Sequence, residues 1–269
     1  MKISVSNIAW HDGKLENFLQ LLESEKCHGV EIAPSKIWNN LSDIKVEQIN
    51  SFNSLIKKYN LELVGFHSLL YGMPELKIFT DEESRIKTKN FLFNLIELCS
   101  KLRGNQLIFG SPKNRETYDL PKKEVEKISH DFFIEIANHS KKNNVYFCIE
   151  PLGKDETNFI NSVSEGGEFV KDLNHSNFRL LLDTKAIFFS QENPLIVLDK
   201  YQKYIQHIHV SDQDLKEPGT INKNHSDIAK AIKNISYNKF LSLEMRRVSG
   251  DEVNSIKRSI KFIKTNYLN

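Results

Sequence analysis

Eight short runs of β-forming residues recur along the chain, and stretches with helical spacing of apolar residues separate them. The runs cover residues 2–10, 29–34, 62–70, 105–112, 145–152, 178–186, 205–212 and 240–247. Strands that alternate with helices predict βαβ units and a parallel sheet. Eight such units in succession favour closure, so we predict an α/β fold of the (β/α)8 TIM-barrel type, with one domain over residues 1–269.

Length and motif content agree with this prediction. The chain has 269 residues, and a (β/α)8 barrel typically needs about 250. No GxGxxG pattern follows the first run, which removes the main evidence for a dinucleotide-binding sheet. The longest irregular stretches, 110–121, 151–167 and 211–224, are predicted to be loops at the rim of the barrel. Within them, Gly166-Gly167 is either a hinge of a lid or an ordinary turn.

The charge balance and the cysteines limit the possible partners and compartments. Lys and Arg number 37 and Asp and Glu number 35, which leaves a net charge of only +2. Nucleic-acid and membrane surfaces usually need a concentrated basic patch, so we expect neither partner. The three cysteines lack metal-binding or disulfide-like spacing, and the amino terminus is too short and polar for a signal peptide. We therefore expect a cytoplasmic protein.

Four of the runs in the second half carry one residue of a type that binds metals. These residues are Glu150, Asp183, His209 and Glu244, and they recur at intervals of about 26 to 35 residues. Parallel strands would bring them to one end of the barrel, and the alternation of side chains places each on the more polar face of its strand. Glu31 follows the same rule. One such acid is ordinarily a helix cap, but three carboxylates with one imidazole suit a divalent ion such as Mn²⁺ or Mg²⁺.

With these residues placed, the order of several short motifs becomes informative. The motifs are IEP at 149–151, LLDT at 181–184, HIHVSD at 207–212, EPG at 217–219 and FLSLEM at 240–245. In this order, the chain resembles the xylose isomerase-like superfamily of TIM barrels over essentially its whole length. The nearest patterns are those of ketose 3-epimerases, hydroxypyruvate isomerases and inosose dehydratases.

The resemblance implies a metal-dependent enzyme that acts on a small carbohydrate. Glu150, Asp183, His209 and Glu244 would hold one divalent ion (Mn²⁺, Mg²⁺, Co²⁺ or Zn²⁺), and the two glutamates would also act as the catalytic acid/base pair. Isomerising an α-hydroxy ketone requires removal of a proton next to a carbonyl, which gives an enediolate. Relatives are often dimers or tetramers, so a homodimer or homotetramer is expected.

One departure from the epimerase pattern concerns the substrate. Epimerases usually place a histidine three residues after the metal-binding aspartate, and this chain has Ala186 there. Lys185 supplies a charge close by. We therefore expect an intact metal site with different substrate contacts.

Seven residues are candidate substrate contacts at the rim: Trp10, His67, Lys113, Arg115, Lys185, His225 and Arg246. The cations after the fourth and eighth strands indicate either a phosphorylated or acidic substrate or simple solvation of the loops. Trp10 either stacks on a sugar or packs in the core. His225 either reaches the rim or caps the next helix with Ser226 and Asp227. His207 is expected to support His209 from behind.

Three other functions remain open beside a sugar isomerase or epimerase. A metal-dependent sugar or cyclitol dehydratase would share the first proton abstraction. An endonuclease IV-like DNA-repair enzyme would need more histidines, one of them near position 186, and a more basic surface. A barrel that binds a sugar without turning it over would not need the complete set of metal ligands.

Overall fold

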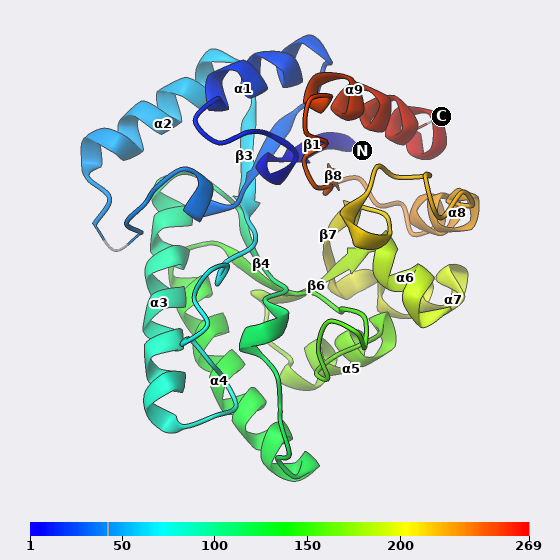
Figure 1. The fold of residues 1–269 in the computed structure, drawn as a ribbon. Coiled ribbons are helices and arrows are strands. Elements are labelled where there is room, and N and C mark those ends of the chain that lie inside the picture. The colour runs from blue at the N-terminus through cyan, green and yellow to red at the C-terminus, as the bar shows by residue number, and fades with distance from the viewer. Residues whose placement is uncertain (42, 269) are drawn as a thin grey trace.

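Eight parallel strands form a closed barrel in chain order, with β8 paired to β1, in a computed structural model that describes residues 1–41 and 43–268 (Figure 1). The strands are β1 (Lys2–Ser6), β2 (Gly29–Ile32), β3 (Glu62–Phe66), β4 (Gln106–Phe109), β5 (Tyr146–Ile149), β6 (Phe178–Asp183), β7 (Ile205–Val210) and β8 (Phe240–Leu243). Each begins within a predicted run, and the (β/α)8 prediction is confirmed.

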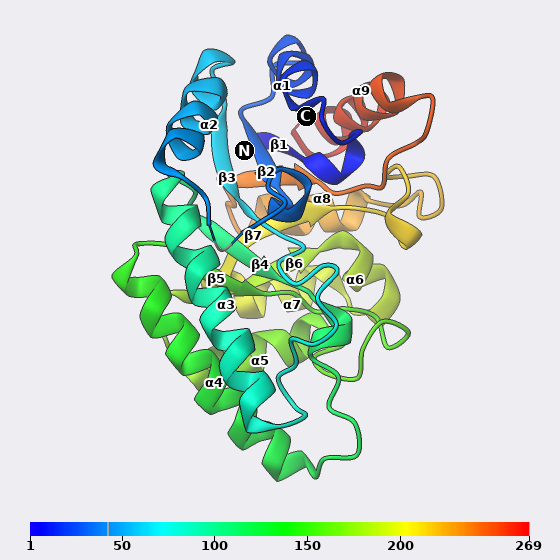
Figure 2. The same cartoon turned by 60° about the vertical axis from the view of Figure 1, so that its left-hand side comes forward.

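Helices surround the barrel on its outside, and the two ends of the chain lie near each other in both views (Figures 1 and 2). The helices are α1 (Leu15–Ser24), α2 (Val46–Lys58), α3 (Glu82–Lys101), α4 (Lys122–Lys142), α5 (Val163–Leu173), α6 (Thr184–Ser190), α7 (Pro194–Tyr201), α8 (Ser226–Asn234) and α9 (Glu252–Ile263). Among the described residues, none of these helices has the length and apolar character needed to cross a membrane.

Side-chain caps fix where several of the helices begin. Asp81 precedes α3 and accepts a hydrogen bond from the amide of Ser84, and Ser162 does the same for α5 through the amide of Glu165. Such caps satisfy amides that have no partner within the helix, and each contributes about 1 kcal/mol.

The main core lies between the strands and the helices. One part of it is aromatic: the ring centroid of Phe133 on α4 lies 5.6 Å from that of Phe109 on β4 and 5.4 Å from that of Phe178 on β6. All three side chains are fully buried. Each contributes about 1.5–3 kcal/mol by leaving water, so this cluster fixes α4 against the strands that end at the candidate site.

A second apolar cluster fills part of the barrel interior. Ile108, Cys148 and Leu181 form it, apart from the main core. Cys148 and Leu181 lie two residues before Glu150 and Asp183, so each pair shares one face of its strand. The apolar cluster therefore lies deeper in the barrel, and Glu150 and Asp183 lie above it at the carboxyl ends of their strands.

The predicted runs extend two to four residues too far at their carboxyl ends. The chain leaves the sheet there in tight turns, such as the 3₁₀ segments Asn7–Ala9, Pro34–Lys36 and Pro112–Asn114. These turns retain apolar residues, so a pattern of β-forming residues does not mark the end of the strand. Both alternatives for Gly166-Gly167, a hinge of a lid and an ordinary turn, are wrong, because both residues lie within α5. A Cβ on Gly167 would come within 2.4 Å of the Tyr201 ring, so this glycine allows α5 and α7 to pack closely.

Candidate metal centre

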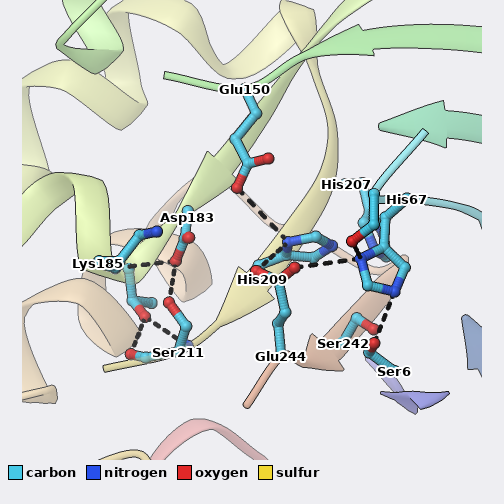
Figure 3. A network of polar contacts seen from close by, with 12 residues as sticks. Ser6, His67, Glu150, Asp183, Lys185, His207, His209, Ser211, Ser242 and Glu244 are labelled. Atoms are coloured by element: carbon cyan, nitrogen blue, oxygen red, sulfur yellow. Dashed lines mark hydrogen bonds and ion pairs between the residues drawn. The ribbon is translucent and has the colours of Figure 1, made fainter. Parts of the chain in front are cut away.

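Four side chains from four strand ends meet at one end of the barrel. Glu150, Asp183, His209 and Glu244 each offer a ligand atom, and these atoms all lie within 4.8 Å of one another. All four residues are buried. Figure 3 shows the three carboxylates around the His209 ring. The structure thus brings together the four residues that the sequence analysis selected, hereafter the carboxylate–histidine cluster.

Asp183 serves as a helix cap and still has one oxygen available. It is the N-cap of α6, where its Oδ1 accepts the amide hydrogen of Lys185 at 2.9 Å and a hydrogen bond from the Ser211 hydroxyl. Its Oδ2 is buried and has no hydrogen-bond partner. The ordinary explanation for an acid at a strand end therefore accounts for one oxygen only.

Glu150 reaches the centre because the residue that follows β4 is a glycine. A Cβ on Gly110 would lie 2.4 Å from Oε2 of Glu150, so the glycine leaves room for the carboxylate in this position. Behind it, the fully buried guanidinium of Arg115 donates a hydrogen bond from Nη1 to the backbone carbonyl of Glu150 at 2.8 Å. These contacts fix the backbone of Glu150 and leave its carboxylate free of side-chain hydrogen bonds among the described residues.

Glu244 lies between two imidazole rings. Its Oε1 is 3.2 Å from Nδ1 of His67, and its Oε2 is 3.2 Å from Nδ1 of His209. The other nitrogen of His67 is 2.7 Å from the hydroxyl of Ser6 on β1. His67 is buried by these contacts, so it faces a glutamate of the cluster, while direct contact with substrate stays a prediction.

His209 connects the cluster to a second buried acid. Its Nε2 lies 3.0 Å from Oε2 of Glu31, and its Nδ1 lies 3.9 Å from Oε1 of Glu150. Nδ1 is buried and has no hydrogen-bond partner of good geometry. Nε2 of the ring thus faces Glu31, and Nδ1 faces Glu150 and Glu244.

The electrostatics of the two glutamates differ. Burial, and then repulsion by Glu244, raises the pKa of Glu150 well above its usual value. Burial also raises the pKa of Asp183. For Glu244, burial acts in the same direction, but the charges of His209 and His67, each 3.2 Å away, outweigh it, so this pKa is lowered. The pKa of His209 is raised because Glu31 and Glu244 together outweigh its burial.

The donor set fits a divalent cation. A buried carboxylate oxygen and a buried imidazole nitrogen, Oδ2 of Asp183 and Nδ1 of His209, lack hydrogen-bond partners at the point where the ligand atoms converge. Leaving such groups unpaired costs about 1–3 kcal/mol each. Three carboxylates would offset a charge of +2, and oxygen with one imidazole nitrogen is the set preferred by hard or borderline divalent ions.

A cavity of about 230 Å³ is lined by Lys185, Phe188, Phe189, Gln213 and Asn222, and Lys185 connects it to the cluster because its amide donates to Asp183. The Lys185 ammonium is buried and lies 3.2 Å from Oε2 of Glu156. Burial would lower the pKa of Lys185, but Asp183 and Glu150 outweigh it and keep this lysine charged. The cavity therefore combines aromatic walls with one ammonium and two amides, and Lys185 is the candidate contact that lies in it.

The other candidate contacts lie apart from this cavity. Trp10 packs against Phe18 with ring centroids 5.5 Å apart and donates its indole N–H to the carbonyl of Lys14. Lys113 and Arg246 are exposed. Arg115 is not a solvated loop residue, as one alternative held, because it is fully buried. The structure therefore does not gather the predicted cations into one site.

His225 follows neither of the two alternatives considered for it. It occupies the N-cap position of α8, but its side chain makes no capping hydrogen bond. Instead the ring is buried, with Nδ1 2.5 Å from the hydroxyl of Tyr267 near the carboxyl terminus. Sequence spacing could not predict this contact, because the partner is 42 residues away in the π-helical segment Lys264–Leu268.

Three serines, one bonded to the cluster residue Asp183 and two bonded to its neighbours His67 and Glu31, had no role in the sequence analysis. They are Ser6 on β1, Ser211 after β7 and Ser242 on β8. Glu31 was assigned to the barrel interior by its position in β2 but had no partner. The alternation of side chains along a strand could have predicted Ser6, Glu31 and Ser242, since each lies on the inward face of its strand.

The fold and this cluster define a (β/α)8 barrel with a buried carboxylate–histidine centre at the carboxyl ends of its strands, where barrels of this type carry their active sites. The profile of the xylose isomerase-like TIM barrel matches residues 19–266. The chain belongs to this family, as the motifs predicted.

Relatives of known sequence are sugar epimerases. The chain is 29% identical to a D-psicose 3-epimerase of Ruminiclostridium cellulolyticum over 124 residues, which cover 46% of this chain and 42% of that relative. The match thus spans about two fifths of the length of that relative. A probable ketose 3-epimerase of Synechocystis sp. is 24% identical over 91% of this chain and 84% of its own length.

Solved structures show the same fold over the whole chain. A D-psicose 3-epimerase from Clostridium cellulolyticum H10, solved with D-tagatose, superimposes with a TM-score of 0.83 at 20% identity, covering 99% of both chains. An L-ribulose 3-epimerase gives a TM-score of 0.84 at 17% identity, covering 99% of this chain and 94% of that one. At this level of identity the likeness supports the fold alone.

Proposed function

We propose that this protein is a divalent-metal-dependent epimerase or isomerase of a ketose or a ketose derivative. The observation that carries the proposal is the convergence of Glu150, Asp183, His209 and Glu244, whose ligand atoms all lie within 4.8 Å of one another. Two of these side chains are glutamates, and a carboxylate can take up or return a proton beside a bound substrate. The ketose 3-epimerases among the relatives agree with this chemistry.

The residues divide the work of proton transfer between them. One oxygen of Glu244 can accept the proton from the carbon next to the substrate carbonyl. Glu150 can deliver a proton to the opposite face of that carbon, which inverts its configuration. Acid and base groups of this kind contribute about 10²–10⁴-fold each.

Glu150, Asp183, His209 and Glu244 would together hold the cation. When bound, a divalent ion polarises carbonyl and hydroxyl oxygens and stabilises the negative charge that develops on them by several kcal/mol. Asp183 is anchored through Oδ1 by the Lys185 amide and Ser211, so its position does not depend on the ion. Activity with Mn²⁺, Mg²⁺, Co²⁺ and Zn²⁺ in turn identifies the metal.

The cavity beside the cluster suggests a substrate with several hydroxyl groups. Gln213, Asn222 and Lys185 offer hydrogen bonds, and Phe188 and Phe189 offer apolar faces. Lys185 is already paired with Glu156, so the cavity does not need an anionic group to balance it. We expect neutral ketoses to be turned over at least as well as their phosphates.

Hydrogen exchange with solvent tests this proposal directly. The protein is incubated in D₂O with Mn²⁺ and a panel of ketoses and ketose phosphates, and deuterium at the carbon beside the carbonyl is followed by NMR. Incorporation together with the epimer supports the proposal, whereas loss of a hydroxyl indicates the dehydratase. Binding without exchange would contradict it. Glu97→Gln removes a partly exposed carboxylate on α3, away from the cluster, and should exchange hydrogen as the unaltered protein does.

Location and assembly complete the proposal. All three cysteines, Cys27, Cys99 and Cys148, are free and buried, which suits a reducing compartment such as the cytoplasm. A homodimer or homotetramer is expected, and light scattering of the purified protein measures it.

A further inference from the structure

Glu31 is a fully buried acid outside the carboxylate–histidine cluster. It lies on β2, and its Oε2 is 3.0 Å from Nε2 of His209 and 2.7 Å from the Ser242 hydroxyl. The Nε2 atom of His207 is 3.4 Å from Oε1, which otherwise has no partner. Three polar groups from β7 and β8 therefore face one carboxylate inside the barrel.

The chemistry of a carboxylate fixes the direction of these contacts. An ionised carboxylate has no hydrogen to donate, so His209 and Ser242 must both donate to Glu31. His209 therefore carries a hydrogen on Nε2. A neutral imidazole has only one such hydrogen, so Nδ1 then presents a lone pair. Nδ1 is the nitrogen that lies near Glu150 and Glu244.

We propose that Glu31 is a positioning residue that holds His209 with Nδ1 as the metal-binding atom. This inference rests on the metal centre of the proposed function. Histidine ligands commonly donate their second N–H to a carboxylate, which fixes the ring and makes the ligand nitrogen more basic. Ser242 fixes Glu31 in turn, since its hydroxyl reaches the same oxygen as His209.

A second ion bound by Glu31, His207 and His209 is the competing explanation, because their ligand atoms also lie within 4.8 Å of one another. Both ring nitrogens of His209 would then bind a metal, which requires loss of both ring hydrogens. The 3.0 Å separation of Nε2 and Glu31 matches an ordinary hydrogen bond. We therefore assign Glu31 to support of one ion.

The direct test uses the unaltered protein loaded with ¹¹³Cd²⁺ and labelled with ¹⁵N-histidine. Scalar coupling of one cadmium to Nδ1 of His209, with a hydrogen still on Nε2, supports the proposal. Coupling to Nε2, or two cadmium ions per chain, overturns it. If no cadmium binds, the metal centre itself is wrong. The role of Glu31 is then tested by the tautomer of His209 in metal-free protein at alkaline pH. A hydrogen on Nε2 supports the proposed role, and a hydrogen on Nδ1 overturns it.

Variants give an independent measurement. Glu31→Gln keeps the shape of the side chain but can turn its amide N–H toward His209, so we expect Mn²⁺ affinity to fall about 10–100-fold. Ser242→Ala removes one contact of Glu31 but keeps the carboxylate, so its loss should be smaller. Unchanged Mn²⁺ affinity in a folded Glu31→Gln protein would overturn the proposal, as would a shift of the His209 ¹⁵N signals equal in the two variants.

Discussion

Glu244 and Glu150 lie on two sides of the carboxylate–histidine cluster, and their surroundings shift the pKa of a glutamate in opposite directions. On one side, both oxygens of Glu244 face imidazole nitrogens at 3.2 Å, and its pKa is lowered. On the other, the Glu150 carboxylate has its nearest imidazole nitrogen at 3.9 Å, and its pKa is raised by burial. Neighbouring donors, rather than burial itself, therefore decide which glutamate holds a proton.

The largest effect should come from removing either carboxylate. We expect Glu150→Gln and Glu244→Gln each to lower kcat by about 10²–10⁴-fold, since each removes a proton-transfer group. They should differ in Mn²⁺ affinity measured near pH 6. Glu244→Gln removes a charge that is already present, whereas Glu150→Gln mimics the protonated form. Equal losses of affinity at this pH would contradict the asymmetry between the two sides.

A pair of glycines separates effects on the site from effects on the fold. In Gly110→Ala the new Cβ would lie 2.4 Å from the movable end of Glu150, so we expect kcat to fall by up to about 10²-fold with little change in Tm. In Gly65→Ala it would lie 2.2 Å from the backbone carbonyl of Gln106, which cannot move aside. That variant should instead lose about 1–3 kcal/mol of stability. A large fall in Tm for Gly110→Ala with normal kcat would contradict this account.

Removal of the metal should destabilise the folded protein. At a free Mn²⁺ concentration of about 100 times Kd, binding contributes about 2.7 kcal/mol, which corresponds to a change in Tm of about 5 °C or more. Calorimetry with and without a chelator measures this difference. Asp183→Asn is the control, because a protein without the site should not respond. An unchanged Tm in the original protein would count against the centre.

The smallest expected effect is a dependence of metal-free stability on pH, and its sign differs between the two sides. The folded state binds the Glu150 proton more tightly than the unfolded chain does, so the stabilising contribution of Glu150 is lost as pH rises from about 4.5 through its raised pKa. Glu150→Gln should therefore raise the stability of the metal-free protein at pH 8 by on the order of 1 kcal/mol and have little effect at pH 4.

For Glu244 the sign reverses. Its folded-state pKa is lowered, so it stabilises the folded protein above about pH 4.5, and this contribution is lost as pH falls through the lowered pKa. Glu244→Gln should reduce metal-free stability at pH 8. Denaturant unfolding of both variants at the two pH values compares them, and shifts of the same sign would remove the distinction between the two sides.

The sequence predicted the barrel and the cluster because both depend on regular periods. Strand runs and the alternation of their side chains place Glu150, Asp183, His209 and Glu244 on inward faces at strand ends, and parallel pairing then brings the ends together. Contacts within loops have no such period. The partner of His225 and the burial of Arg115 depend on how irregular segments fold, and local pattern does not encode that.

Anomalous diffraction from crystals grown with Mn²⁺ tests the central claim most directly. We predict one manganese peak per chain, within bonding distance of a carboxylate oxygen from each of Glu150, Asp183 and Glu244 and of Nδ1 of His209. A peak bound by Glu31 and His207 instead, or no peak among these side chains at saturating Mn²⁺, would contradict the account.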